Sequence, residues 1–168
     1  LSFTDDDAIL CPDWLREITN VFSMDANVVA VAGRILIRWD EKPPDWVIPY
    51  EGLLGKLDYG DKIKFEKNLY INGGNFHIRK DILYRLGGFN PDQIGDWLIG
   101  DGEMGLCHRL HEKGYLIGWS PKALMEHCQT VQKNATIKDI KRRFINNGIA
   151  VPYRMFALEK GGYMALIK

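Results

Sequence analysis

The sequence has no excess of charge of either sign, because 22 basic and 22 acidic side chains cancel. Without a net charge there is no long-range field to attract nucleic acid or an anionic membrane. We therefore expect no nucleic-acid partner, and recognition through local contacts.

Cysteine is scarce, with three residues at Cys11, Cys107 and Cys128 and no CxxC spacing. An odd count without such spacing argues against a disulfide framework and indicates a reducing compartment. We expect thiols in the core and a cytoplasmic location.

Long apolar runs are also missing. The run from Val28 to Ala32 is far too short to cross a bilayer, and no signal-peptide pattern opens the sequence. The 46% hydrophobic content still suffices for the core of one domain over residues 1–168.

Apolar periodicity gives the expected elements. Helices are predicted at 14–22, with Asp13 as the cap, and at 80–86, 103–113 and 136–147, the last with a Thr136-Asp139 capping pattern. Strands are predicted at 1–4, 28–37, 69–71, 76–79, 115–119 and 123–127. Gly33 marks a bulge or a close approach, and Asn72-Gly-Gly-Asn75 forms a tight turn between two short strands. These elements predict an α/β fold.

Two glycine- and proline-rich segments, 40–60 and 91–102, are predicted to be loops. Long loops are uncommon in compact domains unless they are functional or disordered. Trp46, Tyr50 and Trp97 in these loops offer flat apolar faces for a sugar ring, with core packing as the alternative. For Trp14 and Trp119 core packing is the better interpretation.

An acidic run, Asp5-Asp6-Asp7, follows the first strand. In extended backbone Asp5 and Asp7 face one side and Asp6 the other, which suits Mg²⁺ or Mn²⁺. A calcium loop starting at Asp5 is excluded, because Leu10 would stand at its glycine position and Arg16 at its glutamate position. A solvated acidic turn is the alternative.

Seven short motifs follow one another in the order found in a known family. They are Phe3-Thr-Asp-Asp-Asp7 with Pro12-Asp-Trp-Leu15, Val31-Ala-Gly-Arg34, Asn72-Gly-Gly-Asn75 with Arg79, Leu86-Gly-Gly-Phe89, Gly100-Asp-Gly-Glu103, Arg109-Leu110, and Pro121 before His127. In this the chain resembles glycosyltransferase family 2, which has the GT-A fold. The resemblance implies a mixed sheet flanked by helices and a metal-dependent, inverting sugar transfer.

The resemblance also implies roles for individual residues. The cation, Mn²⁺ or Mg²⁺, would bind Asp7 with Asp5 and His127. Asp5 and Asp6 would contact the nucleotide, and Gly73, Gly74 and Asn75 the donor sugar or diphosphate. Glu103 would be the catalytic base, with Asp101 as the alternative because relatives carry a Glu-Asp pair where Gly102-Glu103 stands here.

The partners implied are a nucleotide-diphosphate sugar and a glycan or lipid-linked acceptor. Lys138, Lys141, Arg142 and Arg143 are candidates for contact with diphosphate, or with membrane phosphates through peripheral association, although such a helix face is usually solvated. A non-catalytic carbohydrate-binding or regulatory module, and a phosphohydrolase of nucleotide sugars, are the alternative functions.

The metal motif of this fold follows a nucleotide-binding region of roughly 80 to 100 residues, the size of two or three strand-helix units. Here Asp5 is almost the first residue. We therefore expect the chain to be the metal- and acceptor-binding part of a catalytic domain without its N-terminal nucleotide-binding half. On this expectation the segment alone binds nucleotide poorly and does not turn over.

Overall fold

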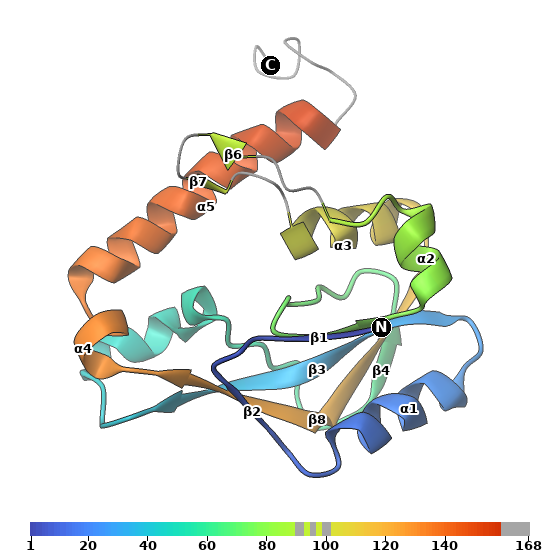
Figure 1. Ribbon diagram of the computed structural model, residues 1–168, viewed down its shortest axis with the longest axis horizontal. Helices are drawn as coiled ribbons and strands as arrows, with labels where there is room; N and C mark the ends of the chain where they lie inside the picture. Colours follow the sequence, from blue (N-terminus) through green and yellow to red (C-terminus); the bar gives the residue numbers. More distant parts are fainter. Residues whose placement is uncertain (90–92, 95–96, 99–101, 159–168) are drawn as a thin grey trace.

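The computed structural model describes residues 1–89, 93–94, 97–98 and 102–158 (Figure 1). Its elements in chain order are β1 (Ser2–Thr4), β2 (Ala8–Leu10), α1 (Trp14–Met24), β3 (Val28–Trp39), the 3-10 helix η1 (Asp45–Leu54), β4 (Lys64–Glu66), β5 (Asn75–Ile78), α2 (Lys80–Arg85), β6 (Gln93–Ile94), β7 (Trp97–Leu98), α3 (Gly102–Glu112), β8 (Leu116–Gln129), α4 (Val131–Asn134) and α5 (Ile137–Leu158).

The main sheet has the strand order β1-β5-β3-β8-β2, with β4 also paired to β8. The long strands β3 and β8 run parallel at its centre, and the other pairings are antiparallel. The short strands β6 and β7 pair separately. The predicted α/β fold with a mixed sheet and flanking helices is therefore confirmed, and it is compatible with a GT-A-like fold.

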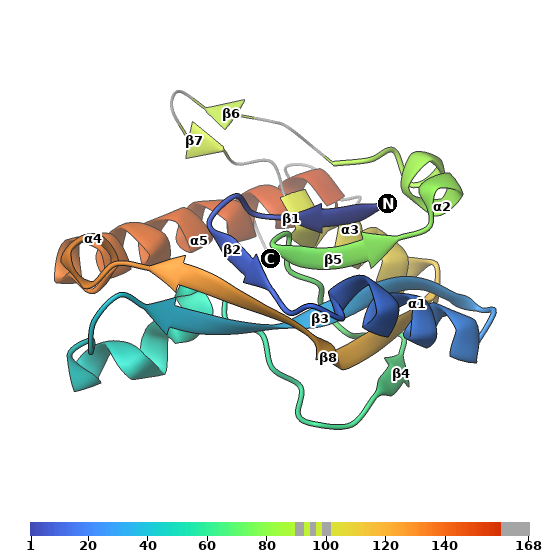
Figure 2. The same cartoon turned by 60° about the horizontal axis from the view of Figure 1, so that its bottom comes forward.

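Helices cover both faces of this sheet (Figure 2). On one face α1 packs Trp14, Ile18 and Val21 against β3 and β8. On the other, α2 and α3 enclose a larger core that includes Phe76, Trp119 and Cys107. Trp14 and Trp119 are 7% and 0% exposed, so both are core residues as predicted.

The predicted cap of α1 is wrong. Asp13 occupies the N-cap position but makes no capping hydrogen bond. Its carboxylate instead pairs with Arg16 at 2.7 Å, because the arginine lies one turn further along the same face. By contrast Thr136 caps α5 as predicted, since its Oγ1 accepts the Asp139 N–H at 3.1 Å.

The segment predicted as a long loop at 40–60 contains η1. Val47 and Leu54 on this helix are buried against Ala135 and form a small third core. Pro43, Pro44 and Pro49 break the α-helical pattern in the sequence, but the tighter 3-10 turn accommodates Pro49 inside the helix.

Two strand predictions need correction. Residues 69–71 form no strand, and β5 pairs with β1 and β3 instead of with a hairpin partner. The two strands predicted at 115–119 and 123–127 are one strand, β8. Pro121 does not end this strand, because it lies in the stretch where β8 makes no ladder pairs with β3 and no backbone N–H is needed from it.

Gly33 lies at this interruption, as predicted. The β3–β8 register shifts between Gly33 and Ile35. A Cβ at Gly33 would lie 2.3 Å from the Asn75 amide nitrogen, so only glycine lets the asparagine enter the gap.

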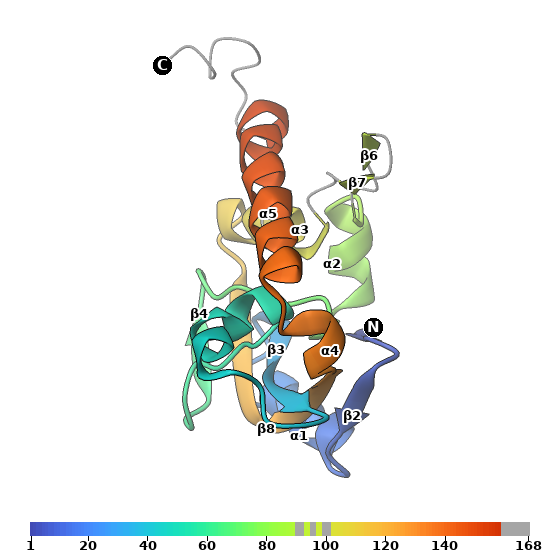
Figure 3. The ribbon, with the colours of Figure 1, turned by 90° about the vertical axis from the view of Figure 1, so that its left-hand side faces the viewer.

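After β8 the chain turns through α4 into α5, which leads away from the sheet (Figure 3). Among the helices of the described residues, none is long and apolar enough to cross a membrane.

Candidate functional site

Strand pairing brings Asp7 and His127 together, although they are far apart in sequence. In the antiparallel ladder of β2 and β8, Ala8 pairs with His127. The Cys128 N–H also donates to the Asp7 carbonyl at 2.9 Å. The loop that carries the acidic run is thereby fixed against the end of β8.

Asp5, Asp7 and His127 form a cluster in which one ligand atom from each residue lies within 4.8 Å of the others. His127 Nε2 and Asp7 Oδ1 lie 3.1 Å apart. The His127 side chain is largely buried, whereas the two carboxylates are exposed. The sequence predicted these three residues as cation ligands, and the structure brings them together; Asp6 is outside this group.

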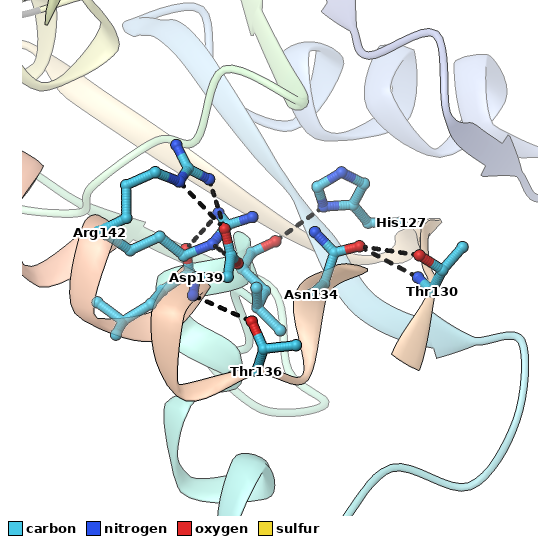
Figure 4. Close-up of polar contacts among 9 residues, drawn as sticks. His127, Thr130, Asn134, Thr136, Asp139 and Arg142 are labelled. Carbon is cyan, nitrogen blue, oxygen red and sulfur yellow. Dashed lines mark hydrogen bonds and ion pairs between the residues drawn. The ribbon is translucent and has the colours of Figure 1, made fainter. Parts of the chain in front are cut away.

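The second ring nitrogen of His127 is already bound. Nδ1 lies 2.9 Å from the Leu54 carbonyl oxygen at the end of η1 (Figure 4). A carbonyl accepts and cannot donate, so Nδ1 carries a proton. In a neutral ring Nε2 then presents a lone pair to Asp7 Oδ1, and two lone pairs at 3.1 Å repel unless a proton or a cation lies between them.

This arrangement fits a divalent cation. Metal-bound histidines usually donate their other N–H to a carbonyl or carboxylate, which orients the ring and fixes the tautomer. Two carboxylates and one imidazole leave coordination positions open for a substrate. The imidazole shifts the preference from Mg²⁺, which favours oxygen ligands, towards a transition ion such as Mn²⁺.

The turn at residues 72–75 separates this cluster from Glu103. A Cβ at Gly74 would lie 2.6 Å from Asp5 Oδ2, and a Cβ at Gly73 would lie 3.5 Å from Glu103 Oε2. Glycine is therefore needed at position 74 for the Asp5 carboxylate to approach the turn. Glu103, in the first turn of α3, places its carboxylate beside the neighbouring Gly73, close enough that an added Cβ would touch it.

Two backbone N–H groups of this turn have partners inside the turn itself. The Gly74 N–H donates to Asn72 Oδ1 at 2.9 Å and the Asn75 N–H to the Asn72 carbonyl at 3.1 Å. These two groups are therefore engaged within the turn and do not face a ligand. The glycines serve the close packing of carboxylates.

The Asn75 side chain lies in the core, where all of its polar atoms have partners. It is 0% exposed, and its Oδ1 accepts the Trp14 Nε1–H at 2.8 Å. Its amide group donates to the carbonyls of Arg34 and Ala123, both at 2.9 Å. Asn75 thus joins α1, β3 and β8 where the ladder is interrupted, and the contact with the donor that the resemblance implies for this residue stays a prediction.

Two predicted acceptor aromatics lie on η1. Trp46 and Tyr50 are 42% and 38% exposed, and Tyr50 also packs edge-on against Phe144 of α5. The side chain of Trp97 and all of Asp101 lie outside the described residues. Contact of these aromatic rings with a sugar stays a prediction.

A cavity of about 570 Å³ opens beside the cation cluster. Asp7 and His127 form one end of it, and the ends of β3 and β8 with α4 and α5 form the rest. Trp39, from β3, lines this cavity, whereas Trp46 and Tyr50 do not. No pattern in the sequence favours Trp39 over the other aromatic residues, because its place depends on the pairing of β3 with β8.

Asp139 links the two adjacent arginines of α5. It accepts from Arg142 at 2.6 Å and from Arg143 at 2.7 Å, and Arg143 also donates to the Leu53 carbonyl (Figure 4). Burial raises the pKa of Asp139, but the hydrogen bonds from Arg143 and Arg142 outweigh it, so the pKa is lowered overall. One carboxylate shared by two guanidinium groups leaves this triad positively charged.

Sequence reasoning missed Leu54, Gly55 and Gln129. Gly55 has φ of +98°, and a Cβ there would lie 3.2 Å from His127 Nδ1. Leu54 acts through its carbonyl, so its side chain gives no signal. A glycine at the end of a helix is a recognisable C-cap signal, but nothing in the sequence connects it to His127.

No protein-family model matches the chain. The chain is similar to the glucosyl-dolichyl phosphate glucuronosyltransferase of Haloferax volcanii, with 26% identity over 134 residues. The match covers 76% of the chain and 42% of the relative, so the chain spans less than half of the relative's length. This similarity supports a sugar-transfer function in general terms.

Proposed function

We propose that the chain is the cation-binding and base-carrying part of a metal-dependent, inverting glycosyltransferase. It would move a sugar from a nucleotide-diphosphate donor to a hydroxyl of a glycan or lipid-linked acceptor. The observation that carries the proposal is the oriented His127 beside Asp5 and Asp7, with Glu103 at the same glycine turn. The similarity to a glucuronosyltransferase supports the reaction class.

In the proposed reaction, Asp5, Asp7 and His127 hold the cation, Mn²⁺ in preference to Mg²⁺. The cation supplies positive charge that offsets the negative charge of the departing diphosphate. Asp6 stays a candidate for contact with the nucleotide.

Glu103 is the proposed general base. Its carboxylate takes the proton of the acceptor hydroxyl as that oxygen attacks the anomeric carbon. The new C–O bond forms while the bond from the anomeric carbon to the diphosphate oxygen breaks, and the nucleoside diphosphate leaves with the electron pair. Attack from the opposite side inverts the configuration.

The relative's name suggests the first substrates to test, a nucleotide-linked glucuronic acid and a glucosyl polyprenyl phosphate. The experiment compares sugar transfer in Mn²⁺ by the full-length protein, by its Glu103→Gln variant and by its Glu112→Gln variant, which changes the same residue type at the other end of α3. We expect Glu103→Gln to lower turnover by about 10²- to 10⁴-fold and Glu112→Gln to leave it unchanged.

The products separate the alternatives. Unchanged turnover in Glu103→Gln would remove this residue from the mechanism. Free sugar in place of transferred sugar would identify a hydrolase. Binding of sugar without turnover in the unaltered full-length protein would identify a non-catalytic module.

A further inference from the structure

We propose that the cavity between the ends of β3 and β8 and the helices α4 and α5 is a subsite for a glycosyl phosphate, recognised by Trp39, Gln129, Lys133 and Arg142. The inference rests on the proposed function, because the cavity shares Asp7 and His127 with the proposed cation site. It assigns a ligand chemistry to residues outside that site.

Gln129 provides the first argument. Its side chain is 6% exposed, it lines the cavity, and its Oε1 is buried without a hydrogen-bond partner in the described part of the chain. The great majority of buried polar atoms in proteins have a partner, so an unsatisfied one needs an explanation. The Gln129 carbonyl accepts the Asp40 N–H at 3.0 Å, which fixes the backbone of this residue. Protein atoms cover the amide oxygen in this conformation, and a rotation of the side-chain amide towards the cavity would let a ligand hydroxyl satisfy it.

Trp39 provides an apolar wall held in one orientation. Its Nε1–H donates to Glu51 Oε1 at 3.0 Å, and Lys56 donates to the other oxygen of Glu51 at 2.8 Å. Glu51 is 8% exposed, so this pair of contacts lies in a sheltered position. A sugar ring can pack its C–H groups on the aromatic face of Trp39 while one of its hydroxyls donates a hydrogen bond to the Gln129 amide oxygen.

The charges of the cavity favour an anion at its α4–α5 end. Lys133 forms no ion pair with any described residue, and the triad of Arg142, Arg143 and Asp139 keeps a net positive charge. Arg38 also lines the cavity, but Glu126 neutralises it at 2.9 Å.

Two carboxylates also line the cavity. Asp7 belongs to the cation cluster, and Asp40 Oδ1 accepts the N–H groups of Glu41 and Val131 at the start of α4. Asp40 offsets one of the two positive charges of Lys133 and the triad, so this end stays positive. A phosphate therefore finds Lys133 and Arg142 at the α4–α5 end, while a sugar hydroxyl finds Gln129.

Calorimetric titration of the chain in Mn²⁺ tests this proposal with three probes: glucose 1-phosphate, methyl glucoside and inorganic phosphate. We expect glucose 1-phosphate to bind at least about tenfold more tightly than methyl glucoside or inorganic phosphate, because it makes the sugar contacts and the phosphate contacts at once. Equal binding of inorganic phosphate and glucose 1-phosphate would contradict a site for the sugar.

Two variants divide the contacts. Gln129→Met should weaken glucose 1-phosphate about tenfold while leaving the melting temperature unchanged or higher, because it removes an unsatisfied buried atom. Lys133→Gln should weaken glucose 1-phosphate by a similar factor and leave methyl glucoside unchanged. Lys113→Gln, an exposed lysine just beyond α3, is the matched control and should have no effect.

The outcomes separate this proposal from the proposed function. Unchanged glucose 1-phosphate binding in both Gln129→Met and Lys133→Gln would overturn the subsite, whatever Mn²⁺ does. Loss of binding in these variants, in a chain that does not bind Mn²⁺, would keep the subsite and refute the cation site. Repeating the titration with glucosyl farnesyl phosphate and with a nucleotide sugar shows whether a lipid-linked or a donor phosphate is recognised.

Discussion

His127 Nδ1 and the Leu54 carbonyl oxygen lie 2.9 Å apart, and this contact sets the chemistry of the site. It places the proton of the neutral ring on Nδ1 and leaves Nε2 to face Asp7. The residue that follows Leu54 is Gly55, whose backbone adopts φ of +98°. The end of η1 is therefore a positioning element for the proposed cation site.

Gly55→Ala tests this positioning. A Cβ there would press on His127 Nδ1 from 3.2 Å, and the positive φ would be strained. We expect Mn²⁺ affinity to fall about 10- to 100-fold, the range seen when the outer partners of metal ligands are changed.

Gly60→Ala is the matched control, because Gly60 also has positive φ but a Cβ there meets nothing within 4 Å. It should lose stability through strain and keep Mn²⁺ affinity. An equal loss of affinity in the two variants would show that strain alone, and not contact with His127, is responsible.

Asn75→Asp tests the buried junction of α1, β3 and β8. A carboxylate cannot donate to the carbonyls of Arg34 and Ala123, so a buried charge would face two acceptors. We expect the free energy of unfolding in urea to fall by about 3 kcal/mol. Asn20→Asp, on the exposed face of α1, should change it little; a similar loss in both would contradict the role of Asn75.

Burial lowers the pKa of His77 to about 3, so this histidine stays neutral in the folded state. Below about pH 6.5, the ordinary pKa of histidine, the unfolded chain binds a proton at His77 that the folded chain does not. The free energy of unfolding therefore decreases as the pH is lowered. Between pH 7 and pH 5 the loss should be about 2 kcal/mol. His77→Gln should remove this slope in denaturant titrations, and an unchanged slope would assign it to other groups.

Burial also raises the pKa of Cys107 to about 12. The thiolate is the reactive form, so at pH 8 this residue should react with a thiol reagent only as fast as the chain unfolds. In the double variant Cys11→Ser, Cys128→Ser we expect the rapid phase of the reaction to disappear. A rapid phase that persists would show that Cys107 is accessible.

The sequence predicted the fold wherever periodicity was long and uninterrupted. The bounds of helix α2 and the long strand β3 were predicted nearly to the residue, because the apolar side chains that form their sequence patterns are the ones buried in the core. Helix η1 was missed because its prolines resemble those of a loop, and its burial depends on Ala135, far along the chain. Pro121 divided β8 in the sequence, whereas in three dimensions it lies at the interruption opposite Gly33.

The candidate site likewise combines residues that the local sequence identifies with residues that only the assembled fold brings together. Strand alternation paired Asp5 with Asp7, but in the structure Asp6 and Asp7 form a turn between β1 and β2, so the two carboxylates meet for a different reason. His127 joined them only through a family resemblance. The register of β2 against β8 brings these residues together physically. Trp39 and Gln129 carried no local signal, because the cavity they line forms only when β3, β8, α4 and α5 are assembled.

The cation site is the central proposal, and titration of Mn²⁺ followed by electron paramagnetic resonance tests it directly. We expect one Mn²⁺ per chain, at least tenfold weaker binding in Asp7→Asn and in His127→Gln, and unchanged binding in Asp45→Asn, whose carboxylate is 93% exposed. Mn²⁺ binding that is absent from the unaltered chain, or that is the same in all three variants, would contradict it.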